Sequence, residues 1–216
     1  MGQIRVPLAP APVYRVHYGC PPRARPDCVN MRGNMTQERP TIAVFGSSRP
    51  KPGSEAYAQA VTVGRRLAEA GFAVATGGYE GTMAAVSQGA AEAGGHVVGV
   101  GCHRIEAYRG AVLNPYVVEA VHYESLTERL LHLVRYNDGM VVLPGGIGTL
   151  SELALSWSFL QVGEIEPRPL VLLGDLWQQT LDAFQISEWL DDRDRSLLSF
   201  ARTPEEVVEK LLAYSR

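Results

Sequence analysis

Lysine is almost missing from this chain of 216 residues. It contains two lysines, Lys51 and Lys210, and eighteen arginines. Pyridoxal phosphate enzymes need a lysine to form a Schiff base, and such a lysine is usually desolvated. Lys51 lies in a proline-flanked loop and Lys210 lies on the last amphipathic helix, so neither resembles a buried lysine. The sequence therefore argues against pyridoxal chemistry. It also lacks a lysine after any glycine-rich loop, which excludes a Walker phosphate site.

Cysteine is also scarce. Cys20, Cys28 and Cys102 form an odd and sparse set, which argues for a reducing compartment and against a disulfide framework. His17, Cys20 and Cys28 could be read as partial zinc ligands, but their spacing is wrong and a fourth ligand is missing. We therefore expect no bound metal and no cofactor.

Strong net charge and long apolar runs are absent as well. The net charge of −3 gives no overall electrostatic case for binding nucleic acid. No apolar run approaches the roughly 18 residues of a membrane span. The first residues interleave arginine with proline and contain no apolar segment of the kind found in signal peptides. We expect a cytoplasmic protein without a nucleic acid or membrane partner.

The chain divides into two parts of different composition. Residues 1–39 contain six arginines, only two acidic residues and many prolines, without a periodic apolar pattern. This composition is typical of a disordered arm, although a functional basic arm stays open. Residues 40–216 carry the regular patterns and contain no internal repeat. We predict that they form one domain.

From Thr41 onward, short apolar runs alternate with helical patterns. Such alternation indicates βαβ units, a mostly parallel sheet and helices on both faces, which is an α/β fold of the Rossmann type. Ser54 can cap the first helix, and residues 101–115 are predicted to form a loop. The predicted strands are 41–45, 72–75, 96–100, 116–121, 139–143 and 170–173. The predicted helices are 54–70, 82–93, 126–136, 149–162 and 176–189, and a last helix begins at the capping box 203–206.

The most informative segment runs from Val141 to Glu152. An apolar run stops at Pro144, a turn with three glycines follows, and a helix is predicted to begin at Thr149. Unpaired N–H groups and the helix dipole converge at such a junction and make an anion pocket. The alternative is a tight strand-to-helix turn without a ligand. Three glycines followed by the hydroxyl of Thr149 favour close approach by a ligand, so we interpret the segment as a phosphate site. It is not a dinucleotide loop, because the fingerprint G-x-G-x-x-G is absent.

Two further loops follow predicted strands. Gly77 and Gly78 precede a helix that contains Met83, and Gly46 and Ser47 follow the first strand. Ligands of parallel sheets bind at the carboxyl ends of strands near a topological switch point, so the three loops can converge. The Ser47 hydroxyl could donate to a nucleotide or could simply satisfy its own loop.

Arg129 and Glu152 are the charged candidates. Glu152 is the fourth residue counted from Thr149, and the alternative is a surface glutamate that interacts favourably with the helix dipole. Arg129 is flanked by leucines, and the alternative is a solvated helix face shared with Glu128. Sequence spacing alone cannot pair the two side chains.

The nine residues from Pro144 to Glu152 resemble the P-G-G-x-G-T-x-x-E signature of the LOG (Lonely Guy) family, whose members are often labelled lysine decarboxylases. Residues 44–48, 77–83, 114–117 and 128–129 resemble further family segments, and the resemblance runs from Thr41 to the C-terminus. It implies a modified Rossmann fold and a homodimer or a higher, even-numbered assembly. It also implies hydrolysis of the N-glycosidic bond of AMP or of cytokinin riboside 5′-monophosphates.

The resemblance implies that Arg129 and Glu152 are catalytic and that the partner is a purine nucleoside monophosphate. The residues expected to bind phosphate or nucleotide are Gly145, Gly146, Ile147, Gly148, Thr149, Gly77, Gly78, Gly46, Ser47 and Met83. Trp157 and Phe159 are candidates for the subunit interface, with core packing as the alternative.

The chain departs from the family pattern at four positions, namely Tyr79, Thr82, Leu130 and Ser151. Leu130 replaces a motif lysine, and Ser151 replaces the first glutamate of a pair. These two departures motivate an alternative function: a carrier that binds a nucleotide or a phosphorylated cofactor without turnover. A structural relic with an empty pocket is the third reading.

Overall fold

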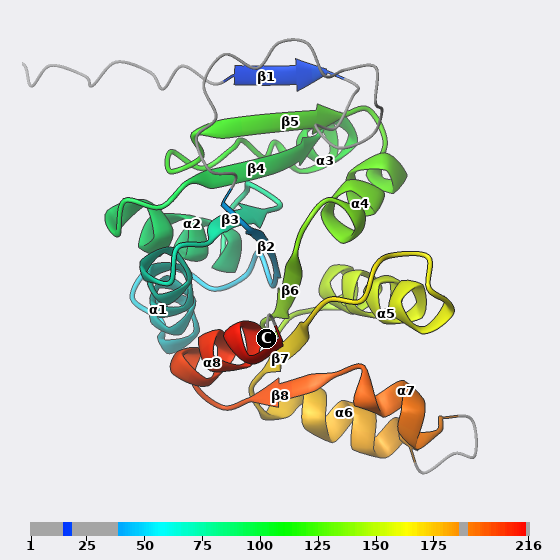
Figure 1. Cartoon of the computed structure of the whole chain (residues 1–216). Coiled ribbons are helices and arrows are strands. Elements are labelled where there is room, and N and C mark those ends of the chain that lie inside the picture. The colour runs from blue at the N-terminus through cyan, green and yellow to red at the C-terminus, as the bar shows by residue number, and fades with distance from the viewer. Residues whose placement is uncertain (1–14, 19–38, 186–189, 215–216) are drawn as a thin grey trace, which may run out of the picture.

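The computed structural model describes residues 15–18, 39–185 and 190–214 (Figure 1). Its strands form one sheet in the order β1-β5-β4-β3-β2-β6-β7-β8. Every pairing between neighbouring strands is parallel, which confirms the predicted α/β fold. The strands are β1 Arg15–Tyr18, β2 Thr41–Phe45, β3 Ala73–Thr76, β4 Val97–Cys102, β5 Glu119–Tyr123, β6 Gly139–Val142, β7 Leu170–Leu173 and β8 Ser199–Ala201.

Helices cover both faces of the sheet (Figure 1). The helices are α1 Glu55–Glu69, α2 Thr82–Glu92, α3 His103–Arg109, α4 Leu126–Arg135, α5 Ile147–Val162, α6 Asp175–Gln185, α7 Asp192–Ser196 and α8 Pro204–Tyr214. One apolar cluster joins the sheet to α1, α2 and α8, and a second joins it to α4, α5 and α6. In β2, Ile42 and Val44 belong to the first cluster, and Ala43 and Phe45 to the second. Because both faces are covered, the central strands β2, β3, β4, β6 and β7 are mostly apolar.

The order in which strands are added to the sheet reverses between β2 and β6. From β2 the chain passes outward through β3, β4 and β5, and then returns to β6 on the other side of β2. The backbone N–H of Thr41 donates to Asp138 at 2.8 Å, which joins the amino ends of the two strands across 97 residues of sequence. Their carboxyl ends therefore border the crevice where parallel sheets bind ligands.

Local capping explains why two of the helices begin where they do. Ser54 accepts a hydrogen bond from the N–H of Tyr57, as predicted. Ser125 and Glu128 form a reciprocal capping box at the start of α4. This box fixes the first turn of α4, and Arg129, the next residue, is directed toward the sheet, where it is buried.

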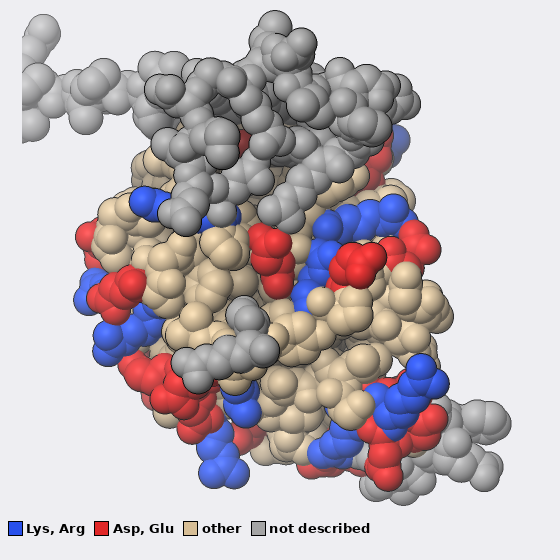
Figure 2. Space-filling view, viewed as in Figure 1, with Lys and Arg blue, Asp and Glu red and all other residues tan. Residues whose placement is uncertain are grey.

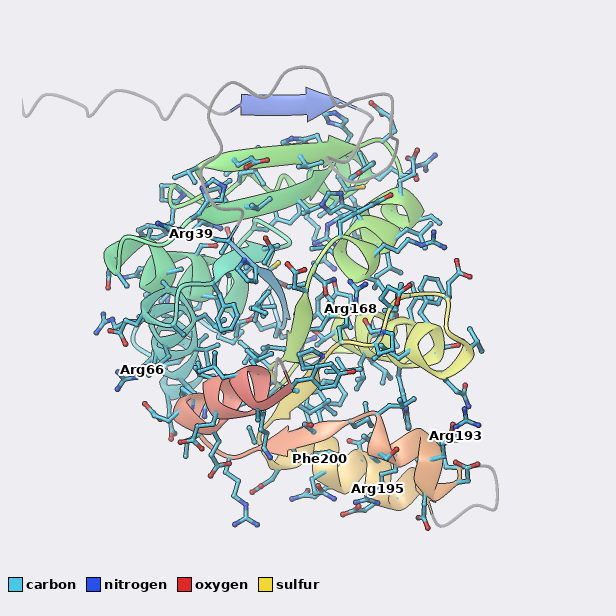
Figure 3. All side chains as sticks on the ribbon, viewed as in Figure 1. Arg39, Arg66, Arg168, Arg193, Arg195 and Phe200 are labelled. Carbon is cyan, nitrogen blue, oxygen red and sulfur yellow. The ribbon has the colours of Figure 1, made fainter. Side chains whose placement is uncertain are left out.

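The prediction that residues 101–115 form a loop is wrong, because α3 lies within them. This seven-residue helix buries none of its side chains, so it has no apolar stripe by which sequence could reveal it. Strand β5 also starts at Glu119, later than the predicted 116. The short elements β8 and α7 were not predicted. Arg195 of α7 lies over the ring of Phe200 on β8, with its guanidinium 5.8 Å from the ring centre (Figure 3).

The predicted arm includes one described segment. Residues 15–18 form β1, which pairs with β5 in a register that matches Arg15 to Glu119. The other residues up to 38 lie outside the described residues, so a disordered arm and a domain beginning at residue 40 stay predictions. The helix predicted for 176–189 ends at Gln185 in the structure, and 186–189 also lie outside the described residues.

Charges of both signs are interleaved on the molecular face in Figure 2, where basic side chains lie next to acidic ones. The ion pairs of the protein include Arg66 with Glu69 and Arg65 with Glu92. Among the residues that the structure describes, none of the helices combines the length and the apolarity that a membrane span requires.

Candidate active site

Three loops meet at the carboxyl ends of the adjacent strands β3, β2 and β6. The carbonyl of Ser47, after β2, accepts from the backbone N–H of Thr82 at 2.8 Å and from its hydroxyl at 3.0 Å. The Ser47 hydroxyl accepts from the N–H of Arg49 at 3.1 Å, so it satisfies its own loop. Gly46 lies against Leu143, the residue that follows β6. The convergence expected from sequence is therefore present, with Ser47 tied to the start of α2.

Helix α5 begins at Ile147, two residues before the predicted start at Thr149. Gly146 is the N-cap residue, and no side chain caps the helix. The prediction that Thr149 starts the helix is therefore wrong. Instead, Thr149 is buried, and its hydroxyl lies so close to Gly145 that a Cβ on that glycine would be 2.2 Å away. The first N–H groups of a helix have no partner within it, so those of α5 are available to a ligand.

The space beside these N–H groups is open. A Cβ placed on Gly146 or Gly148 would meet nothing within 4 Å, and Ile147 is 81% exposed. The uncapped end of a helix carries partial positive charge, which favours an anion. This end of α5 can therefore receive a phosphate without moving the chain.

Arg129 and Glu152 come together behind this loop. Both are buried, at 6% and 9% exposure, and Nη1 of Arg129 lies 3.7 Å from Oε1 of Glu152. The Nε of Arg129 also donates to the carbonyl of Val100 at 2.9 Å. The alternatives of a solvated arginine and a surface glutamate do not hold, and Glu128 closes the capping box instead.

Burial dominates the electrostatics of Glu152. Its desolvation raises the pKa of the carboxyl to about 7, and Arg129 acts in the opposite direction, lowering that pKa. A carboxyl with a pKa near neutral can accept or return a proton at physiological pH. The pair is therefore suited to acid–base work.

Gly77 and Gly78 lie behind the pair and are buried. A Cβ on Gly77 would fall 2.0 Å from Nη2 of Arg129 and 2.6 Å from the sulfur of Met83, so only glycine admits the guanidinium here. The carbonyl of Gly78 accepts from the backbone N–H of Asn114 at 2.7 Å and from its side chain at 2.9 Å. Gly77 therefore makes room for Arg129. The nucleotide contacts expected of Gly77, Gly78 and Met83 stay predictions.

Comparison with known proteins gives the family. The family described as "Possible lysine decarboxylase" matches residues 83–211. A probable cytokinin riboside 5′-monophosphate phosphoribohydrolase of Oryza sativa subsp. japonica is 34% identical over 181 residues, which are 81% of this chain and 71% of that protein. The Arabidopsis thaliana cytokinin riboside 5′-monophosphate phosphoribohydrolase LOG5 is 34% identical over 186 residues, covering 80% and 77% of the two chains. This chain belongs to the LOG family.

A solved structure supports the same fold. The molybdenum cofactor binding protein of the phototrophic bacterium Rippkaea orientalis superposes with a TM-score of 0.66 at 25% identity, covering 84% of this chain and all of that one (100%). The decarboxylase label of the LOG family has no support from lysine here. Lys51 is 72% exposed in its side chain and pairs with Glu80 at 3.3 Å.

Sequence reasoning missed the role of Tyr79, which it noted only as a departure from the LOG pattern. Tyr79 is 4% exposed, and the guanidinium of Arg129 lies 5.9 Å from its ring centre. A large residue at a position where the LOG family has glycine was the only signal for it. Nothing in the sequence indicated that its ring packs against Arg129.

Neither a metal cluster nor the cavity described below coincides with this site in the described residues. Within residues 15–18, 39–185 and 190–214, no group of three or more His, Cys, Asp or Glu side chains could hold a metal ion. Cys20 and Cys28 lie outside the described residues. A cavity of about 350 Å³ opens beside the site, at the carboxyl ends of β7 and β8, and is lined by Gly174, Asp175, Gln178, Phe200, Ala201, Arg202 and Glu206.

Proposed function

We propose that this protein hydrolyses the N-glycosidic bond of a purine nucleoside 5′-monophosphate, of the AMP or cytokinin riboside type. The products are the free base and ribose 5-phosphate. The observation that carries the proposal is the buried pair of Arg129 and Glu152 beside the uncapped N-terminus of α5. The names of the plant relatives support the same substrate class.

The start of α5 holds the 5′-phosphate in this proposal. Gly146 and Gly148 leave open space beside the first turn of α5, whose first N–H groups have no partner within the helix, and the helix dipole favours the negative charge. Binding energy from the phosphate, which does not react, then orients the ribose toward Glu152. The carboxylate faces the sugar, so it does not repel the phosphate.

Glu152 acts on the bond that breaks. As the bond from C1′ to the base nitrogen opens, its electron pair leaves with the base, and positive charge develops on the ribose. The Glu152 carboxylate stabilises this charge and accepts a proton from the water whose oxygen bonds to C1′. The departing base takes up a proton from solvent, and Glu152 releases to solvent the proton that it accepted, so the carboxylate is restored. Arg129 favours the ionised form of Glu152 while burial disfavours it.

The test is release of free base from AMP and from isopentenyladenosine 5′-monophosphate, followed by liquid chromatography. Adenosine, which lacks the phosphate, is the substrate control, and Glu152→Gln is the protein control. We expect release from a monophosphate by the unaltered protein, and little release in either control. If concentrated enzyme frees no base from any purine monophosphate, the proposal is wrong.

A carrier of a nucleotide or phosphorylated cofactor is the second candidate. The structural similarity to a molybdenum cofactor binding protein favours it, as do Leu130 and Ser151, which depart from the LOG pattern. Glu152→Gln separates the two functions, because it should abolish hydrolysis while sparing ligand binding measured by calorimetry. A protein that retains a nucleotide through purification, but never hydrolyses one, would be a carrier.

We further propose that the protein is a cytoplasmic homodimer that pairs through α5. This helix has no strongly polar face, and its exposed positions carry no charge: Ile147, Gly148, Leu150, Ser151, Ala154, Ser158, Gln161 and Val162. Trp157 and Phe159, the candidates from sequence, pack within the chain instead, against the second apolar cluster. Sedimentation should give a dimer, and Leu150→Arg should give a monomer. A monomer for the unaltered chain would contradict this assembly.

A further inference from the structure

Tyr79 forms one side of the space that encloses the Arg129 guanidinium. The other sides are the Val100 carbonyl, which accepts from Nε at 2.9 Å, the backbone at Gly77, and the carboxylate of Glu152. The ring of Tyr79 lies 5.9 Å from the guanidinium carbon, within the range of a cation–π contact. The ring therefore lies against the same guanidinium that faces Glu152.

The ring is held in place through its hydroxyl. The backbone N–H of Cys102 donates to this oxygen at 2.6 Å, and the hydroxyl lies 3.2 Å from both the Cys102 carbonyl and Oε1 of Glu106. Burial raises the pKa of Tyr79 to about 12, so the phenol keeps its proton and can accept from one group while donating to another. The hydroxyl thereby fastens the ring to the end of β4 and to α3.

Glu106 connects this hydroxyl to two histidines. Its Oε1 lies 2.9 Å from Nε2 of His122 on β5, and its Oε2 lies 3.2 Å from Nδ1 of His103. The two imidazole rings are stacked, with centres 5.4 Å apart. No residue of α3 is fully buried, and these polar contacts help to tie the helix to the sheet.

We propose that Tyr79 is a positioning residue for the reaction: its hydroxyl, fixed by Cys102 and Glu106, holds the ring against Arg129 and keeps the guanidinium beside Glu152. The inference rests on the proposed hydrolase function. Tyr79 touches no reacting atom in this account. It acts through Arg129. Glu106 on α3 helps to fix the Tyr79 hydroxyl and so acts on Arg129 through the same ring.

The consequence is specific to the chemical step. If the ring loses its anchor, the guanidinium moves away from Glu152 and favours the ionised carboxylate less. The pH at which Glu152 ionises then rises, and less carboxylate is present at neutral pH. The phosphate site on α5 is built from backbone groups of residues 147–149 and does not use the Arg129 side chain, so we expect substrate affinity to change little.

Tyr79→Phe tests this proposal, because it removes the hydroxyl and keeps the ring. We expect the acidic limb of the kcat profile to move upward by about half a pH unit, roughly halving kcat at pH 7, with KM unchanged. Tyr108→Phe is the matched control, since Tyr108 lies on α3 and is 86% exposed. Glu106→Ala should move the profile in the same direction. Combining it with Tyr79→Phe should add little, because both changes release the same ring.

A second measurement does not depend on turnover. In protein labelled with 13C at the glutamate carboxyls, the Glu152 signal is assigned by its loss in Glu152→Gln and then titrated. A higher pKa of Glu152 in Tyr79→Phe than in the unaltered protein supports the proposal, even if the unaltered protein hydrolyses nothing. A lack of hydrolysis would refute only the hydrolase function. If folded Tyr79→Phe titrates like the unaltered protein, the proposal is overturned. If Tyr79→Phe does not fold, Glu106→Ala decides in the same way.

Discussion

Replacing Glu152 by glutamine should change how the stability of this protein depends on pH. In the folded protein the pKa of Glu152 is raised to about 7 from an ordinary value of 4.5, because burial outweighs the attraction of Arg129. A carboxyl with a raised pKa stabilises the fold fully below its unfolded pKa. That contribution is lost as pH rises through the folded pKa. The unaltered protein should therefore lose stability between about pH 4.5 and pH 7, relative to Glu152→Gln.

The size of the effect follows from the shift. One pKa unit corresponds to 1.36 kcal/mol, so the rise from 4.5 to about 7 corresponds to about 3 kcal/mol. Glutamine also leaves the buried charge of Arg129 without its partner, which costs stability at every pH. That cost shifts the difference in unfolding free energy between the two proteins by the same amount at every pH, whereas the titration of Glu152 makes this difference change with pH. The change with pH is therefore the quantity that reports on Glu152.

The assay is urea unfolding of both proteins at pH values from 4.5 to 8.5. The free energy of unfolding of the unaltered protein, minus that of Glu152→Gln, should fall by about 3 kcal/mol over this range and level off above pH 8. Other groups, such as His132, whose pKa burial lowers to about 4, are present in both proteins and cancel. A difference that stays constant with pH would refute the reasoning that Glu152 is buried and protonates near neutrality.

Three further outcomes are expected. Gly148→Ala should leave the melting temperature unchanged, because a Cβ there meets nothing within 4 Å. It should nevertheless weaken AMP binding measured by calorimetry, and equal affinity would show that the phosphate does not bind at this loop. Asn114→Ala should lower the free energy of unfolding by about 2 kcal/mol in urea titration, because the buried carbonyl of Tyr79 loses the Asn114 side chain as a donor and that of Gly78 keeps only the backbone N–H of residue 114; a loss below about 0.5 kcal/mol would contradict this. Trp177→Phe should cost about 1 kcal/mol in the same assay, because its indole N–H donates to the carbonyl of Leu143 at 3.1 Å; an unchanged midpoint would show that this bond contributes nothing.

The alternation of apolar runs and helical patterns was enough to predict the parallel sheet, because every central strand is buried on both faces and reads as a continuous apolar run. It was not enough for α3, which contacts the sheet through Glu106 and buries no side chain. Hydrophobic periodicity reveals a helix by its buried face, and no residue of α3 is fully buried. Its capping glycine, Gly110, gave a signal only for where it ends.

The site was partly predictable for a similar reason. The glycine loop and Glu152 are contiguous in sequence, so local pattern reveals them. Arg129 belongs to another helix and comes beside Glu152 only through packing, with the capping box at Ser125 setting its direction. The network at Tyr79 joins residues from three separate segments by polar contacts, and no periodicity records it.

The central pairing of β2 with β6 also has a consequence for folding. Thr41 and Asp138, which meet at the start of these strands, are separated by 97 residues, and pairing so distant in sequence costs loop entropy before it gains contacts. Gly46 and Leu143, which lie against each other at the site, come together only when that pairing is complete. The site should thus be one of the last features to appear during refolding, and a nucleotide should stabilise only the finished molecule, leaving the early folding steps at their own rate.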